Sequence, residues 1–377
     1  MKICVVGGGN LGTLIAAELA VRGHEVAVLT SKPEKFQNTI HVLNQEKNTE
    51  YDGKLAKVSD QAGDVIPQSE VIFVTVPSQI VERKLAAITP FVKAGAFVGI
   101  VPGSGGGEFY GRELLNRGAY LFGLERVPYI VRLKEYGRSV YNLSTKKELT
   151  AACLPGGKTE TIRGILEELF QIPCSGAKNY LTITLTPSNP ILHTTRLYSM
   201  FRDYDGRKEY DHMIRFYEEW DLESSQNLIA CDEELQQICK AYDGLDLTGV
   251  RSLRVHYESE TAQAMTEKIS GIPSFRGIEA PMCKGKQGYI PDITSRYFEE
   301  DFPYGLCIIK GFAVVAGVET PNIDKVLHWY EKLKQVSYYE GERFCGKDLF
   351  GLPLPENFGL DTKQKVTEFY KEQEQEV

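Results

Sequence analysis

The segment KICVVGGGNLGT, residues 2–13, constrains the fold of this chain more than any other stretch. Its apolar start predicts a buried strand, and the run NLGTLIAAELAVRG is typical of a helix closed by Gly23. Between them, Gly7, Gly9 and Gly12 form a GxGxxG pattern. In such a loop the first glycine allows a tight turn, the second lets the backbone approach a pyrophosphate, and the third lets helix and strand pack closely. The segment therefore predicts a dinucleotide bound at the N-terminus of the helix.

Further apolar runs in the first half of the chain predict a parallel sheet. Residues 24–30, 71–77 and 96–103 form short apolar segments separated by helical patterns. Strands that are apolar on both faces occur in parallel sheets that helices cover on both sides. We expect residues 119–128 and 139–145 to extend the same sheet.

The character of the sequence changes after about residue 181. Segments such as SSQNLIACDEELQQICKAY and NIDKVLHWYEKLKQV carry apolar residues at three- and four-residue spacing, which is typical of amphipathic helices. The sequence therefore predicts a Rossmann-type α/β domain with a doubly wound parallel sheet over residues 1–181. An all-α domain is expected over residues 182–377.

The end of the second predicted strand bears on which dinucleotide binds. Enzymes that use NAD usually place Asp or Glu there, where the carboxylate accepts hydrogen bonds from the ribose hydroxyls. This chain has Thr30, Ser31 and Lys32 instead. Two hydroxyl groups and a cation suit a 2′-phosphate, so NADP is favoured over NAD. The alternative is that Lys32 is a solvated surface residue, since Glu34 follows it closely.

The predicted contacts to the cofactor come from the glycine loop and from the ends of two strands. They are Gly7, Gly9, Asn10, Leu11, Gly12, Thr30, Ser31, Lys32, Val76 and Pro77. A second glycine-rich loop, PGSGGGEFYGREL at residues 102–114, follows another predicted strand. Loops at the carboxyl ends of parallel strands line the ligand crevice, so Ser104 is a candidate to contact the nicotinamide or the substrate. A mobile loop without such contacts is the alternative.

Composition argues against several classes of protein. A formal net charge of −8 does not suit a nucleic-acid binder, which needs a basic face. We expect no membrane span, because no apolar run approaches the roughly 20 residues needed to cross a bilayer. We expect no signal peptide either, because the N-terminus enters the glycine loop too soon. The eight cysteines include no CxxC pair, so we expect reduced thiols, no bound metal and a cytoplasmic protein. The expected partners are small-molecule substrates, and the expected assembly is a monomer or homodimer.

The helical pattern SNPILHTTRLYSMF, residues 188–201, carries one of the six histidines in the chain. Hydride transfer to a C=N or C=O carbon needs a proton source at the heteroatom, and imidazole titrates near neutral pH. From the residues alone, His193 is either this acid/base or a core histidine whose ring nitrogens are satisfied by neighbours.

Three motifs carry a resemblance to a known family. NPILH opens the helical half, ERVPYIVRLKEYGR covers residues 125–138, and TSRYFEEDFPYGL covers residues 294–306. With these motifs the chain resembles the octopine/nopaline (opine) dehydrogenase family over nearly its whole length. The resemblance implies a Rossmann domain joined to an all-helical domain that binds substrate. It also implies an NAD(P)H-dependent oxidoreductase that condenses an amino acid with a 2-keto acid and reduces the resulting imine.

The same resemblance implies roles for individual residues. In the family, a histidine of the helical domain is paired with an aspartate as acid/base, and an arginine close before that aspartate assists. The matching positions are His193, Asp301 and Arg296. From the residues alone, Asp301 could equally lie in a solvated loop, and Arg296 could cap a helix or pair with Glu299 or Glu300.

Ser104, Arg126 and Asn189 are further candidates to contact the substrate. Relatives carry a small or apolar residue where this chain has Arg126, and the additional positive charge points to an acidic substrate. Thr194 follows the histidine at a position where family members often have proline. We expect these departures to affect the choice of substrate more than the reaction.

Two other functions remain open from the sequence. One keeps the enzyme class but reduces a 2-keto acid to a 2-hydroxy acid, as ketopantoate-reductase-like proteins on similar folds do. The other is a non-catalytic sensor that binds NADP. A candidate acid/base, a carboxylate and a guanidinium within one domain favour the enzyme.

Overall fold

Two compact units make up the chain, and a computed structural model describes residues 1–375. The first unit comprises residues 1–184 together with the C-terminal segment from Glu368, and the second comprises residues 185–367. The predicted division at residues 181 and 182 assigned the C-terminal segment to the helical domain. In the structure this segment groups with the first unit instead.

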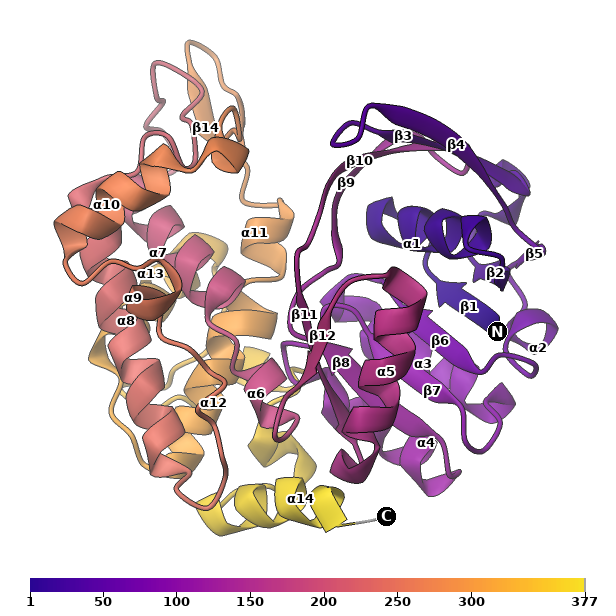
Figure 1. Ribbon diagram of the computed structural model, residues 1–377. Helices are drawn as coiled ribbons and strands as arrows, with labels where there is room; N and C mark the ends of the chain where they lie inside the picture. The colour runs from indigo at the N-terminus through magenta and orange to yellow at the C-terminus, as the bar shows by residue number, and fades with distance from the viewer. Residues whose placement is uncertain (376–377) are drawn as a thin grey trace. The chain divides into compact units, whose positions relative to one another are not determined.

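An eight-stranded sheet forms the centre of the first unit (Figure 1). Its strands are β1 (Lys2–Val6), β2 (Glu25–Leu29), β5 (Lys57–Ser59), β6 (Val71–Val74), β7 (Phe97–Ile100), β8 (Tyr120–Leu124), β11 (Leu149–Leu154) and β12 (Cys174–Gly176). They lie in the order β12-β11-β8-β7-β6-β1-β2-β5, and every neighbouring pair is parallel except β11 with β8. The predicted Rossmann-type sheet is confirmed, with β2, β6, β7 and β8 at the predicted segments.

Short helices connect or follow these strands. They are α1 (Asn10–Val21), α2 (Ala62–Val65), α3 (Val81–Ile88), α4 (Arg112–Asn116), α5 (Thr159–Phe170) and α6 (Leu181–Thr184). The aromatic rings of Phe73, Phe122 and Phe170 pack edge to face in the core beneath them. Gly99 makes room for this cluster, because a Cβ atom there would lie 2.0 Å from the ring of Phe122. The core therefore depends on a small residue in the middle of β7.

A second, four-stranded sheet arches over α1 (Figure 1). In spatial order its strands are β4 (Thr49–Lys54), β3 (Thr39–Asn44), β10 (Ser139–Thr145) and β9 (Tyr129–Glu135). The prediction that residues 139–145 extend the large sheet is wrong, because β10 pairs with β3 and β9. The hairpin of β3 and β4 was not predicted.

Helix α1 is enclosed between the two sheets. Gly53 allows β4 to approach it, since a Cβ atom at this position would lie 2.5 Å from the carbonyl oxygen of Ala17. All residues from Gly12 to Leu19 are buried as a result. This is why the segment is apolar nearly all round instead of amphipathic.

Helices make up nearly all of the regular secondary structure of the second unit, as predicted. They are α7 (Ser188–Phe201), α8 (Leu222–Ala241), α9 (Leu253–His256), α10 (Ala262–Gly271), α11 (Arg296–Glu299), α12 (Cys307–Ala316) and α13 (Pro321–Lys334). A short hairpin of β13 (Met282–Lys284) and β14 (Tyr289–Pro291) is its one named sheet within the described residues. A further helix, α14 (Lys363–Gln375), runs from the second unit back into the first.

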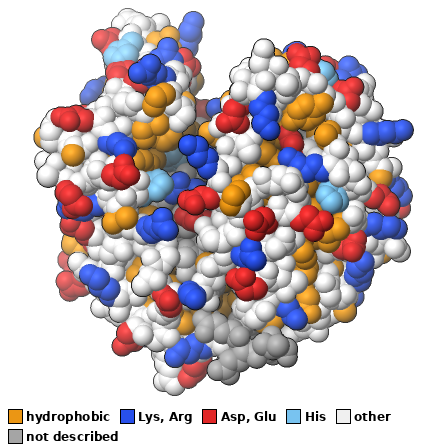
Figure 2. All heavy atoms as spheres, in the orientation of Figure 1, with side chains coloured by type: hydrophobic (Ala, Val, Ile, Leu, Met, Phe, Trp, Pro, Cys, Tyr) orange, Lys and Arg blue, Asp and Glu red, His pale blue; other side chains and the backbone are white. Residues whose placement is uncertain are grey.

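The surface charges and the helices of the described residues agree with two expectations from the composition, which were the lack of a basic face and the lack of a membrane span. On the face drawn in Figure 2, Lys and Arg side chains are interspersed with Asp and Glu side chains and are not gathered into a patch of one sign. None of the helices in residues 1–375 has the length and apolar character required to cross a bilayer.

The buried carboxyl group of Glu108 binds one residue near each of the two points where the chain passes from one unit to the other. Its Oε1 accepts hydrogen bonds from the hydroxyls of Thr184 (2.5 Å) and Tyr370 (2.7 Å). Thr184 is the last residue of the first unit before the chain leaves it, and Tyr370 lies just after the chain returns. The contact with Tyr370 explains why the C-terminal segment groups with the first unit. Burial raises the pKa of Glu108 to about 7.

We expect Glu108→Gln to flatten the pH dependence of stability. Between the ordinary pKa of 4.5 and the folded value of about 7, the folded chain retains a proton that the unfolded chain releases. The free energy of unfolding should therefore fall by up to about 3 kcal/mol as the pH rises through this window. Glutamine stays neutral and keeps an oxygen for both hydroxyls, so the variant should lack this loss.

Urea unfolding at about pH 5 and about pH 8 measures the difference. Glu113→Gln, which changes an exposed carboxylate on α4, serves as the control and should behave like the wild type. Equal pH dependence in Glu108→Gln and the wild type would contradict the role given to Glu108.

Candidate functional site

The predicted cofactor residues gather at one edge of the large sheet. Because β1, β2, β6, β7 and β8 run parallel, the loops that follow them leave from the same edge. Strand β1 lies between β2 and β6, so the chain crosses from one half of the sheet to the other beside it. Ligands of open α/β sheets bind at such a point. The predicted residues that follow these strands are Gly7, Gly9, Thr30, Ser31, Lys32, Val76, Pro77, Ser104 and Arg126.

The glycine loop has the geometry that its spacing predicts. Gly7 has a φ of +117°, in the region that favours glycine. A Cβ atom on Gly12 would lie 2.0 Å from the carbonyl oxygen of Gly7, so helix and strand pack there at backbone contact. Gly9 precedes α1 without a side-chain cap, and a Cβ built on it meets no atom within 4 Å. The start of α1 thus has no side-chain cap and has open space beside Gly9, which suits an incoming pyrophosphate.

Other predicted cofactor residues make contacts within the first unit. The Oδ1 of Asn10 accepts a hydrogen bond from the backbone N–H of Leu133 in β9 (2.7 Å), which ties the loop to the second sheet. Leu11 packs partly against the core, and Val76 lies beside Gly7. Pro77 is exposed. Asn10 thus has a structural contact that the sequence pattern did not indicate.

Tyr136 is a neighbour of the cofactor loop that the sequence analysis missed. Its hydroxyl lies 2.9 Å from the Oγ1 of Thr30, and its ring lies 6.0 Å from the Nζ of Lys32. Gly8 permits this arrangement, since a Cβ there would approach Tyr136 and the ring of Phe36. Ser31 and Lys32 are exposed beyond Thr30. The extra glycine in GGGN was the available signal for a close neighbour.

His193 lies in the first half of α7 and is bound at both ring nitrogens. Its Nδ1 lies 2.8 Å from the Oδ2 of Asp301, and its Nε2 lies 3.1 Å from the hydroxyl of Tyr217. A carboxylate can only accept, so the Nδ1 atom carries the hydrogen of the first bond. The ring also packs against Phe216 and Tyr297, with ring centroids 5.6 and 4.6 Å away. The histidine and the aspartate, 108 residues apart, thus form a contact in the structure.

Tyr217 completes the set of side chains around His193, and sequence reasoning missed it. Burial raises the pKa of its hydroxyl well above the ordinary value, and the Asp301 charge adds to the effect. The hydroxyl therefore stays protonated and can donate to Nε2 when the imidazole is neutral. Its ring stacks on Phe275 with centroids 4.1 Å apart. No spacing rule connects Tyr217 with His193, because the two lie on different elements.

Close packing at a glycine brings Asp301 to the histidine. Asp301 directly precedes a π-helical turn, Phe302–Leu306, in which a Cβ on Gly305 would lie 3.1 Å from Pro190. The turn can thus lie against the start of α7. Thr194 occupies the position of the usual proline and donates its hydroxyl to the carbonyl of Pro190 (2.5 Å). The α7 helix continues through this residue.

Arg196, one turn after the histidine, holds the segment that carries Tyr217. Its guanidinium donates to the backbone carbonyls of Phe216 (3.0 Å) and Glu219 (2.6 Å), on either side of Tyr217. Only 2% of the Arg196 surface is exposed, and this burial lowers its pKa to about 10. No pattern in the sequence indicated a role for this arginine.

The remaining predicted residues are less enclosed. Arg296 on α11 binds the Oε1 and Oε2 atoms of Glu300 through its Nε (3.0 Å) and Nη2 (2.8 Å), which is one of the alternatives left open by the sequence. Its side chain is 75% exposed. Asn189 is exposed in the first turn of α7, and Ser104 is half-buried. Arg126 is half-buried beside Glu125, with 3.7 Å between the Nε and Oε1 atoms.

Family models match both halves of the chain. Residues 2–102 match the N-terminus of NAD-dependent glycerol-3-phosphate dehydrogenase. Residues 176–334 match the α-helical domain of NAD/NADP octopine/nopaline dehydrogenase. The first match falls on the glycine loop and the sheet edge, and the second includes both His193 and Asp301.

Relatives and solved structures agree with these models. The chain is 30% identical to tauropine dehydrogenase from Arabella iricolor over 79% of each protein. It is 29% identical to octopine dehydrogenase from Mizuhopecten yessoensis over 99% of this chain and 100% of the relative. A solved octopine dehydrogenase with NADH and pyruvate superposes with a TM-score of 0.86 at 27% identity, over 97% of each chain. This chain therefore belongs to the octopine/nopaline (opine) dehydrogenase family and is an NAD(P)-dependent oxidoreductase.

Proposed function

We propose that this dehydrogenase joins an amino acid to a 2-keto acid and reduces the imine that they form. The hydrogen-bonded pair of His193 and Asp301 carries the proposal, because it provides a proton donor in the helical unit of an opine dehydrogenase. The names and complexes of the relatives, including pyruvate with NADH, support the same substrate classes. The product would be an N-(carboxyalkyl) amino acid.

The chain's own residues would hold the cofactor at the edge of the large sheet. Gly7, Gly9 and Gly12 leave the start of α1 open to the pyrophosphate. When bound, the nicotinamide supplies the hydride for the imine carbon. Val76 and Pro77, at the end of β6, are proposed to contact the cofactor beside this loop.

His193 is proposed to be the acid/base of the reaction. Its imidazolium would donate a proton at the reacting heteroatom, while Asp301 stabilises the positive charge and fixes the ring through Nδ1. The substrate would bind at Nε2, the nitrogen that Tyr217 contacts in this structure. Tyr217 would then align the ring until the substrate takes its place. Arg196 is a positioning residue, because it acts through the Tyr217 segment.

Four polar side chains are proposed to bind the carboxylates of the substrates. Arg296 uses Nε and Nη2 for Glu300, so its Nη1 is the atom proposed for a carboxylate. Arg126 and Ser104 are proposed on the cofactor side, since both follow strands at the edge of the large sheet. Asn189 is proposed at the start of α7.

NADP is the proposed preferred cofactor. Thr30, Ser31 and Lys32 follow β2 without a carboxylate that would repel a 2′-phosphate, and the Lys32 side chain is exposed. A cytoplasmic location is also proposed, because all eight cysteines are free thiols, as expected in a reducing compartment.

The reaction is tested by oxidation of NADPH and NADH with common amino acids crossed with pyruvate, 2-oxoglutarate and oxaloacetate. We expect oxidation to require both substrates and the product mass to equal that of the reduced condensation product. Oxidation with a keto acid alone would instead support the 2-hydroxy acid reaction. No oxidation with any pair would favour the non-catalytic sensor.

We expect His193→Ala to lower kcat by at least about 10²-fold, because it removes the proton donor. Asp301→Asn should lower kcat at least about tenfold, since an amide cannot stabilise the imidazolium charge. Steady-state kinetics and NADPH titration measure both effects, and cofactor affinity should stay unchanged. His256→Ala, at an exposed histidine of α9, is the control. Full activity in His193→Ala would refute the assignment.

Lys32→Ala and Ser31→Asp should each raise the KM for NADPH relative to NADH by about tenfold. The first removes a charge-assisted contact to the 2′-phosphate, and the second adds a repelling carboxylate. Lys2→Ala serves as control, since Lys2 lies at the amino end of β1 and so at the other edge of the sheet. Unchanged ratios of the two KM values in both variants would overturn the NADP assignment.

A further inference from the structure

A polar cavity of about 360 Å³ lies in the first unit, at the far end of α1 from the glycine loop. Its wall is made by the end of α1, the β3–β4 hairpin, strands β9 and β10, and the end of α5. The 12 residues of α1 separate it from the loop by about 18 Å along the helix axis. The cavity is therefore a different site from the proposed cofactor site.

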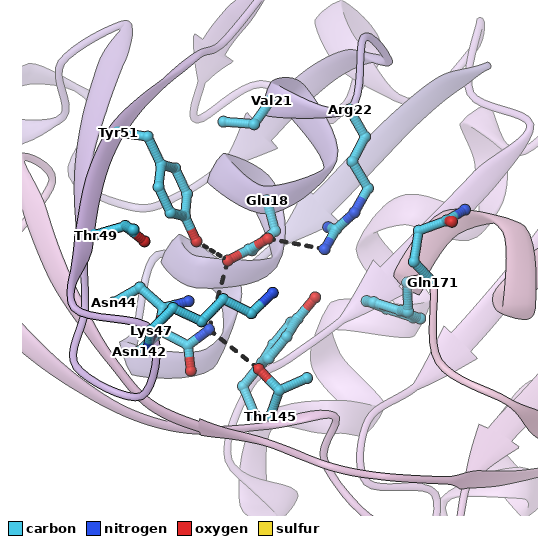
Figure 3. A pocket seen from close by; sticks show the side chains of 12 residues that line it. Glu18, Val21, Arg22, Asn44, Lys47, Thr49, Tyr51, Asn142, Thr145 and Gln171 are labelled. Carbon is cyan, nitrogen blue, oxygen red and sulfur yellow. Dashed lines mark hydrogen bonds and ion pairs between the residues drawn. The ribbon is translucent and has the colours of Figure 1, made fainter.

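An internal ion pair occupies one side of this cavity (Figure 3). The carboxylate of Glu18, which is only 6% exposed, binds the Nη2 of Arg22 at 2.9 Å through Oε2. Its Oε1 accepts hydrogen bonds from the hydroxyl of Tyr51 and from the Nδ2 of Asn142 (3.5 Å). Burial, and then the bond to Glu18, raises the pKa of Tyr51 to about 12. The Glu18 carboxylate is thus already satisfied by protein groups.

Three other buried polar atoms around the cavity make no short, well-aligned hydrogen bond. They are the Nη1 of Arg22, the hydroxyl of Tyr129 and the Oδ1 of Asn142. Tyr129 and Asn142 are each only 1% exposed, and both line the cavity. The Arg22 guanidinium interacts with the Tyr129 oxygen, which leaves the hydroxyl hydrogen of Tyr129 and the Oδ1 of Asn142 without a protein partner. Because buried polar groups are almost always paired, these atoms indicate that something polar binds there.

The charges around the cavity favour an anion. The charges of Glu18 and Arg22 cancel each other, whereas Lys47 adds a positive charge from the β3–β4 turn. In Figure 3 the amino group of Lys47 and the guanidinium of Arg22 both point toward the middle of the cavity. Arg22, Lys47 and Tyr129 are donors, as a carboxylate requires, and the Oδ1 of Asn142 is an acceptor.

We propose that this cavity binds a small carboxylate that also carries an amine or hydroxyl group. The carboxylate accepts from Arg22, Lys47 and Tyr129, and the amine or hydroxyl donates to Asn142. A simple anion would leave the Asn142 oxygen unpaired, and a simple cation would meet Arg22 and Lys47. The volume is sufficient for a ligand of this kind.

Isothermal titration of the full chain with four probes tests the proposal. Glycine and glycolate provide a carboxylate with an amine or a hydroxyl, acetate provides the carboxylate alone, and methylammonium provides the cation alone. We expect glycine, glycolate or both to bind at least about tenfold more tightly than acetate and methylammonium, because each loses partners in the cavity.

Two variants locate the binding in this cavity. Lys47→Ala removes an exposed cation, and Tyr129→Phe removes only a hydroxyl whose polar neighbour is Arg22, so both should fold. Each should weaken the tight-binding probe about tenfold. Lys54→Ala, on the same hairpin but outside the cavity lining, should bind like the wild type. Any glycine bound elsewhere in the chain would be insensitive to the first two changes.

Three results would overturn the proposal. They are the absence of binding by any probe, acetate binding as tightly as glycine and glycolate, and wild-type affinity in both Lys47→Ala and Tyr129→Phe. In each case water would be the better account of the orphan atoms.

Discussion

The contact between Gly12 and Gly7 fixes the position of α1, and much of the first unit depends on it. Any side chain at residue 12 would collide with the carbonyl oxygen of Gly7, so the helix can lie against the end of β1 only because glycine is there. This contact directs the start of α1 toward the sheet edge where the cofactor residues gather. It also brings residues 12–19 between the two sheets, with Gly53 allowing β4 to close over them.

The two ends of α1 present different chemical groups. The N-terminal end is free of side-chain caps and presents backbone N–H groups, which suits a phosphate. The C-terminal end carries Glu18 and Arg22 beside a polar cavity. Both ends of α1 lie beside the same strand, since Leu133, the partner of Asn10, and Tyr129, in the cavity wall, belong to β9.

In the helical unit, too, close packing of the backbone positions the side chains of the candidate site. Gly305 allows the turn after Asp301 to lie on α7, and the carboxylate then reaches His193. Arg196 secures the Tyr217 segment on the other side of the ring through two backbone carbonyls. The histidine is thus held from two directions by elements far apart in the sequence.

The sequence by itself determined the local features of this protein, and the tertiary structure decided the contacts between them. The glycine loop, the buried strands and the helical second half follow from residue patterns, because turns, strands and helices depend on neighbours a few positions apart. The segment 139–145 was assigned to the wrong sheet, since a strand's pattern does not specify its partner. Tyr136, Tyr217 and the cavity beside Glu18 were not predicted, because each requires side chains from distant segments. The approach of Asp301 to His193 came from family resemblance alone, and only the folded chain brings the two residues to 2.8 Å.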